Sequence, residues 1–213
     1  MNNSKRSVFG IVFLTIFLDM VGFSIIFPLF PDMLDHYLFL EESMEGGILS
    51  KFVIWVREFG YDSLLGNPSF RLETVIFGGV LGSLYAALQF FFAPIWGGLS
   101  DRYGRKPILL ITLTGTAIGY FLWIMAGDFW LLLLSRVIGG MAGGNISVAT
   151  AAIADVTTRE KRSKGMAFVG IAFGLGFVLG PALGGIASQW DWSNSELVFF
   201  GMHKFSAAAT ISF

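Results

Sequence analysis

The sequence predicts an all-α protein, a polytopic membrane bundle with five full helical spans and an incomplete sixth. Of its 213 residues, 54% are hydrophobic and 14% are charged, and the mean hydropathy is +0.70, which exceeds what a soluble domain carries. Long apolar runs alternate with polar segments, and Lys and Arg concentrate in alternate segments. The predicted spans cover residues 8–30, 75–99, 108–127, 129–154 and 165–189, followed by a partial span over 197–213.

The charge balance and the residue inventory exclude several classes of function. A net charge of −1 provides no basic surface for nucleic acid, and a chain without cysteine has neither disulfides nor thiol chemistry. No His, Asp and Glu spacing of the metal-binding type is present. We therefore expect no metal ion and no cofactor, and an intramembrane enzyme is the weakest of the functional readings.

The first span, residues 8–30, contains one charged residue, Asp19, near the bilayer midplane. An ionised carboxylate at that depth is costly unless it is paired, hydrated or protonated, and intramembrane acids commonly mark ion or proton pathways. We expect Asp19 to face the bundle interior and to couple to protons. The alternative is a structural aspartate whose oxygens are satisfied by neighbouring backbone or hydroxyl groups.

The polar segment of residues 31–74 is acidic, which predicts that it lies on the outer, periplasmic side. Within it, residues 48–59 alternate apolar pairs with charged residues at near-helical spacing. This pattern predicts an amphipathic helix that lies on the membrane surface. We favour a docked structural flap over a functional lid.

The second span, residues 75–99, ends in a tight turn, GGLSDRYGRKP, over residues 97–107. Glycine permits the backbone geometry of such a turn, and its three cations hold it on the cytoplasmic side. Asp101 contributes nothing to that retention, so the turn is predicted to have a second role. Inside the span, Gln89 is the one strongly polar residue, and interhelical hydrogen bonding and cavity lining fit it equally well.

The third span, residues 108–127, is uncharged, whereas the fourth, residues 129–154, carries Arg136 at about 10 Å below the outer surface. Lipid cannot solvate an arginine at that depth, and snorkelling to the outer interface is the alternative. We expect Arg136, together with Gln89 and Asn145, to line a substrate cavity.

The fifth span, residues 165–189, has three glycines spaced four apart, at positions 176, 180 and 184, with Pro181 among them. Small residues at this spacing allow close helix packing, and the proline bends the helix. The orientation of the whole bundle follows from the cations. The predicted cytoplasmic ones are Lys5, Arg6, Arg102, Arg105, Lys106, Arg159, Lys161, Arg162 and Lys164, against Lys51, Arg57 and Arg71 outside, which places the N-terminus in the cytoplasm.

The turn at residues 97–106 resembles the G-x-L-x-D-R-x-G-R-K signature between helices 2 and 3 of the major facilitator superfamily of secondary transporters, with every fixed position matched. The resemblance implies that the acid of this turn helps to close the cytoplasmic side of the carrier. The residues expected in such a gate are Gly97, Asp101, Arg102, Gly104 and Arg105, with Asp155 at the cytoplasmic end of helix 4.

Three further motifs resemble the tetracycline-resistance and multidrug proton antiporters of that superfamily. Residues 18–31 resemble helix 1, with L-D-x-x-G at Leu18 to Gly22 and the later prolines Pro28 and Pro31. Residues 136–140 resemble the R-x-x-x-G motif of helix 4, although Gly139 replaces the family's common glutamine. The antiporter motif of helix 5 is matched by Gly176, Gly180, Pro181, Gly184 and Gly185.

The resemblance implies the N-terminal half of a major facilitator fold and a proton-coupled antiporter for a drug or small solute in the bacterial inner membrane. Its partners would be the lipid bilayer, a small-molecule substrate, protons and a missing C-terminal half, without nucleic acid. Asp19 and Arg136 are expected at similar depth, where they could meet across the cavity. The sixth run is short and has His203 and Lys204 in its middle, so the alternative is a truncated, non-transporting fragment or scaffold.

Overall fold

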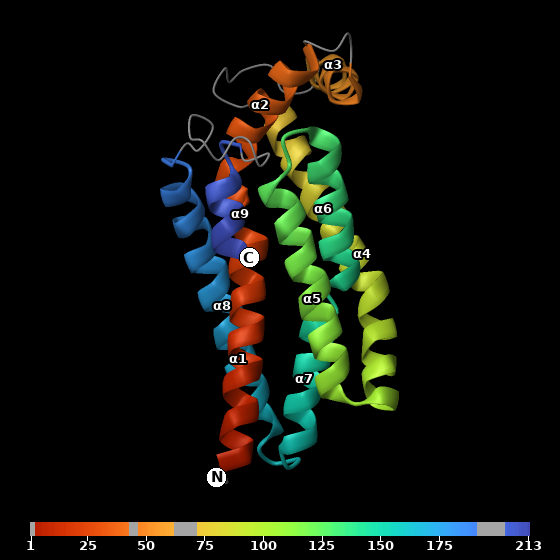
Figure 1. Cartoon of the computed structure of the whole chain (residues 1–213), viewed down its shortest axis with the longest axis vertical. Helices are drawn as coiled ribbons and strands as arrows, with labels where there is room; N and C mark the ends of the chain where they lie inside the picture. Colours follow the sequence, from red (N-terminus) through yellow and green to blue (C-terminus); the bar gives the residue numbers. More distant parts are fainter. Residues whose placement is uncertain (1–2, 43–46, 62–71, 191–202) are drawn as a thin grey trace.

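The computed structural model describes residues 3–42, 47–61, 72–190 and 203–213 as a bundle of helices, and its described residues contain no strand (Figure 1). The all-α fold class is therefore confirmed. The helices are α1 (Asn3–Ser24), the 3-10 turn η1 (Phe27–Leu29), α2 (Phe30–Glu42), α3 (Ile48–Tyr61), α4 (Leu72–Tyr103), α5 (Arg105–Ile124), α6 (Phe129–Ala142), α7 (Asn145–Val156), α8 (Arg162–Ala187) and α9 (Ser206–Ser212). Residues 197–202 of the predicted sixth span lie outside the described residues.

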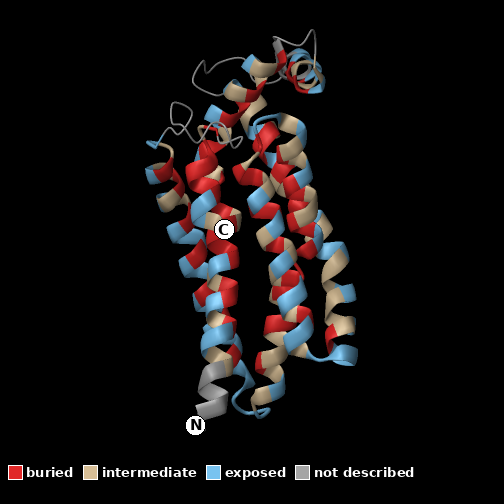
Figure 2. Cartoon of the chain, viewed as in Figure 1, coloured by how far each residue is buried: buried red, intermediate tan, exposed pale blue. Residues whose placement is uncertain are grey.

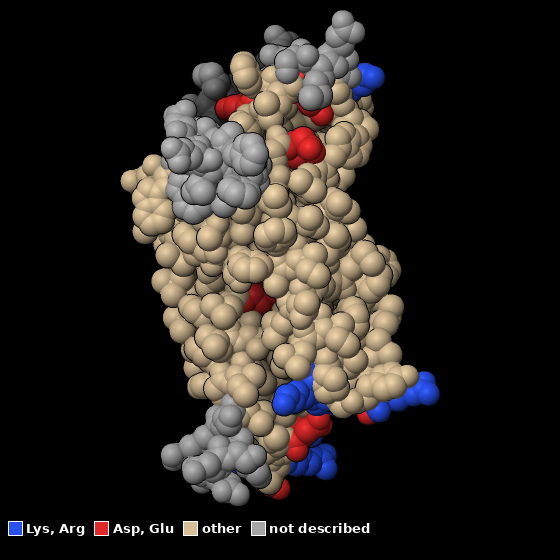
Figure 3. All heavy atoms as spheres, in the orientation of Figure 1, with Lys and Arg blue, Asp and Glu red and all other residues tan. Residues whose placement is uncertain are grey.

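Five helical segments of the described chain are long and apolar enough to cross a membrane. They are Val8–Glu41, Leu72–Tyr103, Arg105–Ile124, Phe129–Val156 and Arg162–Ala187. Many of their exposed side chains are large and apolar, and the exposed positions lie along the outer faces of the helices (Figure 2). Charged side chains gather towards the two ends of the molecule (Figure 3). Such a surface is suited to lipid rather than to water.

The first segment continues beyond its predicted end. α1 stops at Ser24, η1 turns the chain at Pro28, and α2 then extends to Glu42, so the start of the predicted outer loop is helical. Pro28 lies in the first turn of η1 and Pro31 in the first turn of α2, where a backbone N–H would have no intrahelical acceptor. α3 occupies the place where the sequence predicts an amphipathic helix, and the Glu41 carboxylate accepts the backbone N–H of Ser50 in its first turn at 3.0 Å.

The fourth segment is divided, whereas the sequence predicts one helix over 129–154. α6 ends at Ala142, Gly143 and Gly144 form a turn, and α7 begins at Asn145. A Cβ on Gly143 would overlap the side chain of Gln89, and one on Gly144 would overlap Trp96. The two glycines therefore let α4 approach the backbone of this break closely.

The glycines of the fifth segment pack α8 along α1. A Cβ at Gly176 or Gly180 would overlap atoms of α1, and a Cβ at Gly184 would overlap Ile25 and Pro28 just beyond α1, whereas a Cβ at Gly185 would have no neighbour within 4 Å. The first three positions therefore allow α1 and α8 to approach at a distance that larger side chains forbid. This contact determines where α1 places its one buried carboxylate.

Candidate functional site

Asp19 lies in the interior of the bundle, with only 4% of its surface exposed. Its Oδ1 accepts a hydrogen bond of 2.9 Å from Nδ2 of Asn145. The amide of Asn145 is oriented by the break in the fourth segment, because its own Oδ1 accepts the backbone N–H of Ile146 at 2.8 Å. The sequence indicated both residues separately, and the structure brings them together across 126 positions of chain.

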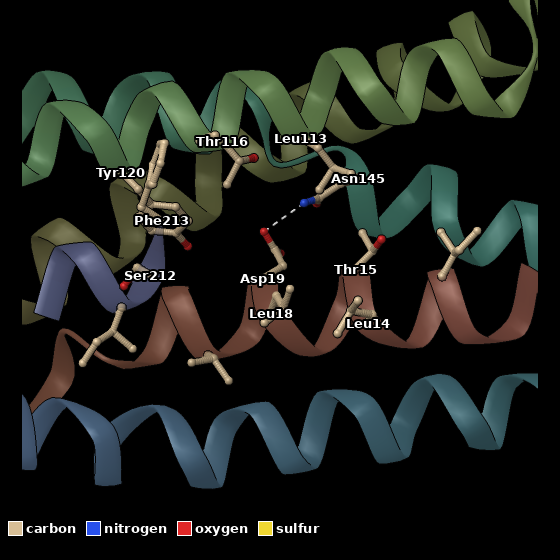
Figure 4. A pocket seen from close by; sticks show the side chains of 14 residues that line it. Leu14, Thr15, Leu18, Asp19, Leu113, Thr116, Tyr120, Asn145, Ser212 and Phe213 are labelled. Carbon is tan, nitrogen blue, oxygen red and sulfur yellow. Dashed lines mark hydrogen bonds between the residues drawn. The ribbon is translucent and has the colours of Figure 1, made fainter. Parts of the chain in front are cut away.

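Asp19 and Asn145 border a cavity of about 460 Å³ between α1, α5, α7 and α9. Figure 4 shows Asp19 of α1 and Tyr120 of α5 pointing into this space from opposite helices, with the Asn145 amide directed at the carboxylate. Thr15 and Thr116 contribute the other polar side chains of the middle part of the wall, and the remaining lining is mostly apolar. The cavity is thus large enough for a small molecule and has one acidic group.

Arg136 is also buried, at 4% exposure, so it does not extend to the outer interface. Its guanidinium lies over the ring of Trp123, with 4.6 Å from Cζ to the ring centroid, which is a cation–π contact. Among the described residues, Asp19 and Arg136 form no ion pair. The expected meeting of these two charges is absent, because α7 presents Asn145 to the carboxylate while α5 holds the guanidinium on its aromatic face.

Gln89 satisfies a backbone group at the helix break. Its Nε2 donates to the carbonyl of Gly143 at 2.8 Å, and this carbonyl lies where the α6 hydrogen-bond ladder ends. Gln89 does not belong to the lining of the 460 Å³ cavity. The geometry therefore favours interhelical bonding, the first of its two expected roles.

A second polar group lies at the end of the bundle that the sequence predicts to be cytoplasmic and consists of Ser100, Asp101, Arg105 and Asp155; we call it the cytoplasmic network. Arg105 bonds Asp101 at 2.6 Å, Asp155 at 2.8 Å and the hydroxyl of Ser100 at 2.6 Å. The network joins the end of α4 and the start of α5 to the end of α7. It contains three of the predicted gate residues.

The other predicted gate residues have different surroundings. Gly104 has a φ of +97°, a conformation that glycine adopts without strain, and it ends the turn before α5. Arg102 lies over the ring of Tyr103 at 5.3 Å. A Cβ on Gly97 would lie 3.2 Å from the Ser147 hydroxyl, so this glycine allows α4 to approach α7.

Sequence reasoning missed the tyrosines of the interior. Tyr85 of α4 and Tyr120 of α5 are both buried, and together with Asp19, Asn145 and Arg136 they make up what we call the intramembrane cluster. A signal for Tyr120 was present in the third span, which we described from the sequence only as uncharged. Thr112, Thr116 and Tyr120 are spaced four apart, so they form a polar stripe on one face of that helix.

Comparisons with known proteins agree with this architecture. The family model of the Major Facilitator Superfamily matches residues 12–211. The mouse major facilitator superfamily domain-containing protein 10 is 40% identical over 187 residues, covering 87% of this chain and 40% of that protein. The class H tetracycline resistance protein of Pasteurella multocida is 34% identical over 182 residues, covering 85% and 38%. The crystal structure of the human organic anion transporter MFSD10 (TETRAN) matches with a TM-score of 0.77 and 33% identity, covering all of this chain and 47% of that one.

Proposed function

This chain belongs to the major facilitator superfamily, and from that premise we propose that it is the N-terminal half of a proton-coupled antiporter that exports a drug or another small solute. The chain spans about 40% of the length of the curated relatives it matches. Their names include a tetracycline resistance protein and, for the solved structure, an organic anion transporter. We therefore propose a small organic molecule as the substrate class.

The observation that carries the proposal is the state of the Asp19 carboxyl group. One oxygen is held by the Asn145 amide, while the other, Oδ2, has no hydrogen-bond partner among the described residues. The group borders the 460 Å³ cavity described above. A buried carboxylate with one free oxygen beside a cavity is placed to take up a proton or to meet a polar group of a substrate.

Proton binding and substrate binding then compete for one site. In the ionised state, Asp19 needs the Asn145 donor and hydration from the cavity, since burial of a charge is costly. Binding of a proton removes that charge and reduces the attraction for a polar substrate. A carrier that alternates access between the two sides of the membrane can use this change to exchange a proton for a substrate.

The cytoplasmic network has a conformational role in this proposal. Arg105 holds Asp101 and Asp155 at the same end of the bundle, which couples the end of α4 and the start of α5 to α7. We assign to it the closing of the cytoplasmic side against the second half of the transporter. The two halves of such a transporter rock against each other, so the contacts between them at this side must form and break during transport.

The location that we propose is a cell membrane, with the N-terminus in the cytoplasm. The cations at the ends of the predicted spans support this orientation. The relatives named above come from a mammal and from a bacterium. We propose the same orientation of this chain whether it resides in the membrane of a bacterial or of a eukaryotic cell. The lipid bilayer, the substrate, protons and a C-terminal half are the proposed partners.

The test is proton-driven transport by the Asp19→Asn variant in proteoliposomes that contain the intact protein. We expect tetracycline-induced proton flux, followed with a pH-sensitive dye, to fall by about 100-fold, because the variant can no longer exchange a proton at this site. Asp32→Asn is the matched control, since Asp32 is an acid of α2 that is paired with Lys204 at 3.5 Å outside the cavity. Undiminished flux in Asp19→Asn would remove Asp19 from the mechanism, and absence of flux in the unaltered protein would support the scaffold alternative.

A further inference from the structure

We propose that Tyr85 and Tyr120, together with ordered water, form a hydrogen-bonded bridge that connects Asp19 to Arg136. The inference rests on the proposed function, in which Asp19 gains and loses a proton. The bridge assigns a positioning role to two tyrosines whose hydroxyl groups have no hydrogen-bond partner among the described residues. It also gives Arg136 a route by which it can act on Asp19, although the two residues form no ion pair among the described residues.

The first observation is a concentration of buried polar atoms that lack a partner among the described residues. Five of them lie in one part of the bundle: Asp19 Oδ2, Tyr85 Oη, Tyr120 Oη, Trp123 Nε1 and Arg136 Nε. They come from four different helices, α1, α4, α5 and α6. Buried polar groups in proteins are nearly always hydrogen-bonded, and ordered water supplies the missing partner where protein atoms do not.

Tyr120 lies between the two charged groups. Its hydroxyl reaches the backbone of α1, because a Cβ on Gly22 would overlap it, and Gly22 is about one turn beyond Asp19. On its own helix, Tyr120 is followed about one turn later by Trp123, the residue on whose ring Arg136 lies. The Tyr120 side chain therefore reaches α1 about one turn from Asp19 and starts about one turn from the residue that holds Arg136, and Figure 4 shows it on the wall of the cavity that Asp19 borders.

Tyr85 supplies the second link, from α4. Its ring lies against Gly139, where a Cβ would come within 3.1 Å of ring atom Cε2, and Gly139 follows Arg136 by about one turn of α6. The ring thus fills the space beside Gly139 that a larger side chain at this position would need. Tyr85 and Arg136 also line a cavity of about 10 Å³, which is close to the volume that one water molecule requires.

The electrostatics of the cluster agree with this arrangement. Asp19 and Arg136 both act on each of the two phenols, Tyr85 and Tyr120. These phenols are the titratable groups that face Asp19 from α4 and α5, and Arg136 of α6 lies beyond them. Asn145 of α7 is not titratable, and the charged residues of α8 lie in its first turn, while α9 has none among its described residues.

A chain of hydroxyl groups and water responds to the protonation of Asp19. Arginine can only donate hydrogen bonds, whereas a phenol and a water molecule can donate and accept. When Asp19 is ionised, all the donors can point from Arg136 towards the carboxylate. When Asp19 binds its proton, the carboxyl itself becomes a donor and opposes that direction, so the arginine favours the ionised state through the bridge. Only one proton is gained or lost, and the phenols keep theirs.

The experiment follows the carboxyl C=O band of protonated Asp19 by infrared difference spectroscopy of the purified chain, with Asp19→Asn to identify the band. Tyr120→Phe and Tyr85→Phe each remove one hydroxyl and keep the ring. We expect the proton concentration at half intensity to fall about tenfold in each variant, because the ionised form loses donors. Gly22→Ala, which displaces the Tyr120 hydroxyl without removing it, is expected to act in the same direction.

Tyr37→Phe is the matched control, since Tyr37 is a third buried tyrosine near Arg136 whose hydroxyl already donates to the carbonyl of Ala126 at 2.8 Å. The control should leave the titration of the band unchanged. An unchanged titration in both Tyr85→Phe and Tyr120→Phe would overturn the bridge, as would an equal shift in all three variants, which would indicate a general effect of packing. Because the spectrum needs no transport, a shifted band in a protein without proton-driven flux would support the bridge and contradict the proposed antiport.

Discussion

The intramembrane cluster and the cytoplasmic network place similar groups in opposite environments. In the network, the side chains of Asp101 and Asp155 are 66% and 55% exposed, and both bond the same arginine. In the cluster, Asp19 and Arg136 are each 4% exposed, and each retains a polar atom without a partner among the described residues. The network therefore consists of ion pairs that are exposed to bulk water, while the cluster is buried from the surface and leaves polar atoms without a protein partner among the described residues.

This difference determines what each group can do. An exposed ion pair contributes about 0 to 1 kcal/mol, so the network can be made and broken at little cost as a carrier changes conformation. A buried charge that loses its partner is far more costly, so the cluster responds strongly to a change in protonation. The first arrangement suits a gate, and the second suits a site of proton exchange.

The largest effect, after loss of the Asp19 carboxyl itself, is expected for Asn145→Leu. The variant removes the donor that holds the ionised carboxylate, so the free energy of unfolding should fall by about 1.5 to 3 kcal/mol. Because the amide stabilises the ionised form, the deficit should be greatest at high pH and should shrink as Asp19 becomes protonated. Denaturant unfolding in detergent micelles at several pH values measures it.

The control for that variant is Thr15→Val, which changes a residue of the same cavity wall without removing a donor from Asp19. Its deficit should not depend on pH. A deficit of Asn145→Leu that stays constant across pH would show that the amide acts only in packing, and the contrast between the two polar groups would then lose its main support.

An intermediate effect is expected for Gly180→Ala. The new Cβ would lie 2.8 Å from the carbonyl oxygen of Val21, a backbone atom that cannot move aside without displacing α1. Overpacking of this kind costs about 1 to 3 kcal/mol, and it should disturb the intramembrane cluster while leaving the cytoplasmic network unchanged. The Asp19 infrared band and cysteine accessibility at the cytoplasmic end distinguish the two regions.

Gly185→Ala on the same helix provides the comparison, because its Cβ would meet no atom within 4 Å. Relief of the helix cost of glycine should stabilise this variant by up to about 1 kcal/mol. Equal stability losses in the two variants would mean that glycine has a backbone role at both positions rather than a packing role at one.

The smallest effect is expected for Arg105→Gln. Loss of both of its ion pairs should raise the labelling rate of a cysteine placed at Ala151 by up to about fivefold, equivalent to roughly 1 kcal/mol, and salt near 1 M should remove most of the difference by screening. Arg102→Gln is the control, since Arg102 lies over Tyr103 and belongs to neither ion pair. A change that persists in high salt would place the network in a more buried environment than its exposure indicates.

Local sequence determined which parts of this protein cross the membrane. Whether a run of about 20 residues inserts into lipid depends on the hydropathy of the residues in that run. The runs around Asp19 and Arg136 therefore predicted their spans without knowledge of the helices that pack against them. The residues of the turn after the second span were predictable for the same reason. Gly104 lies close to Pro107, and Arg105 pairs with Asp101 four positions before it, so this geometry is local, whereas the second ion pair of Arg105, with Asp155, is not.

The tertiary structure alone decided which polar groups meet inside the bundle. Asp19 faces Asn145 rather than Arg136 because the break at Gly143 and Gly144 reorients the second half of the fourth segment. Depth along a helix can be counted from sequence, but the direction of a side chain depends on how each helix is rotated and packed against the others. That rotation follows from close contacts between distant glycines and side chains, such as Gly180 with Ser24, and no local pattern contains it.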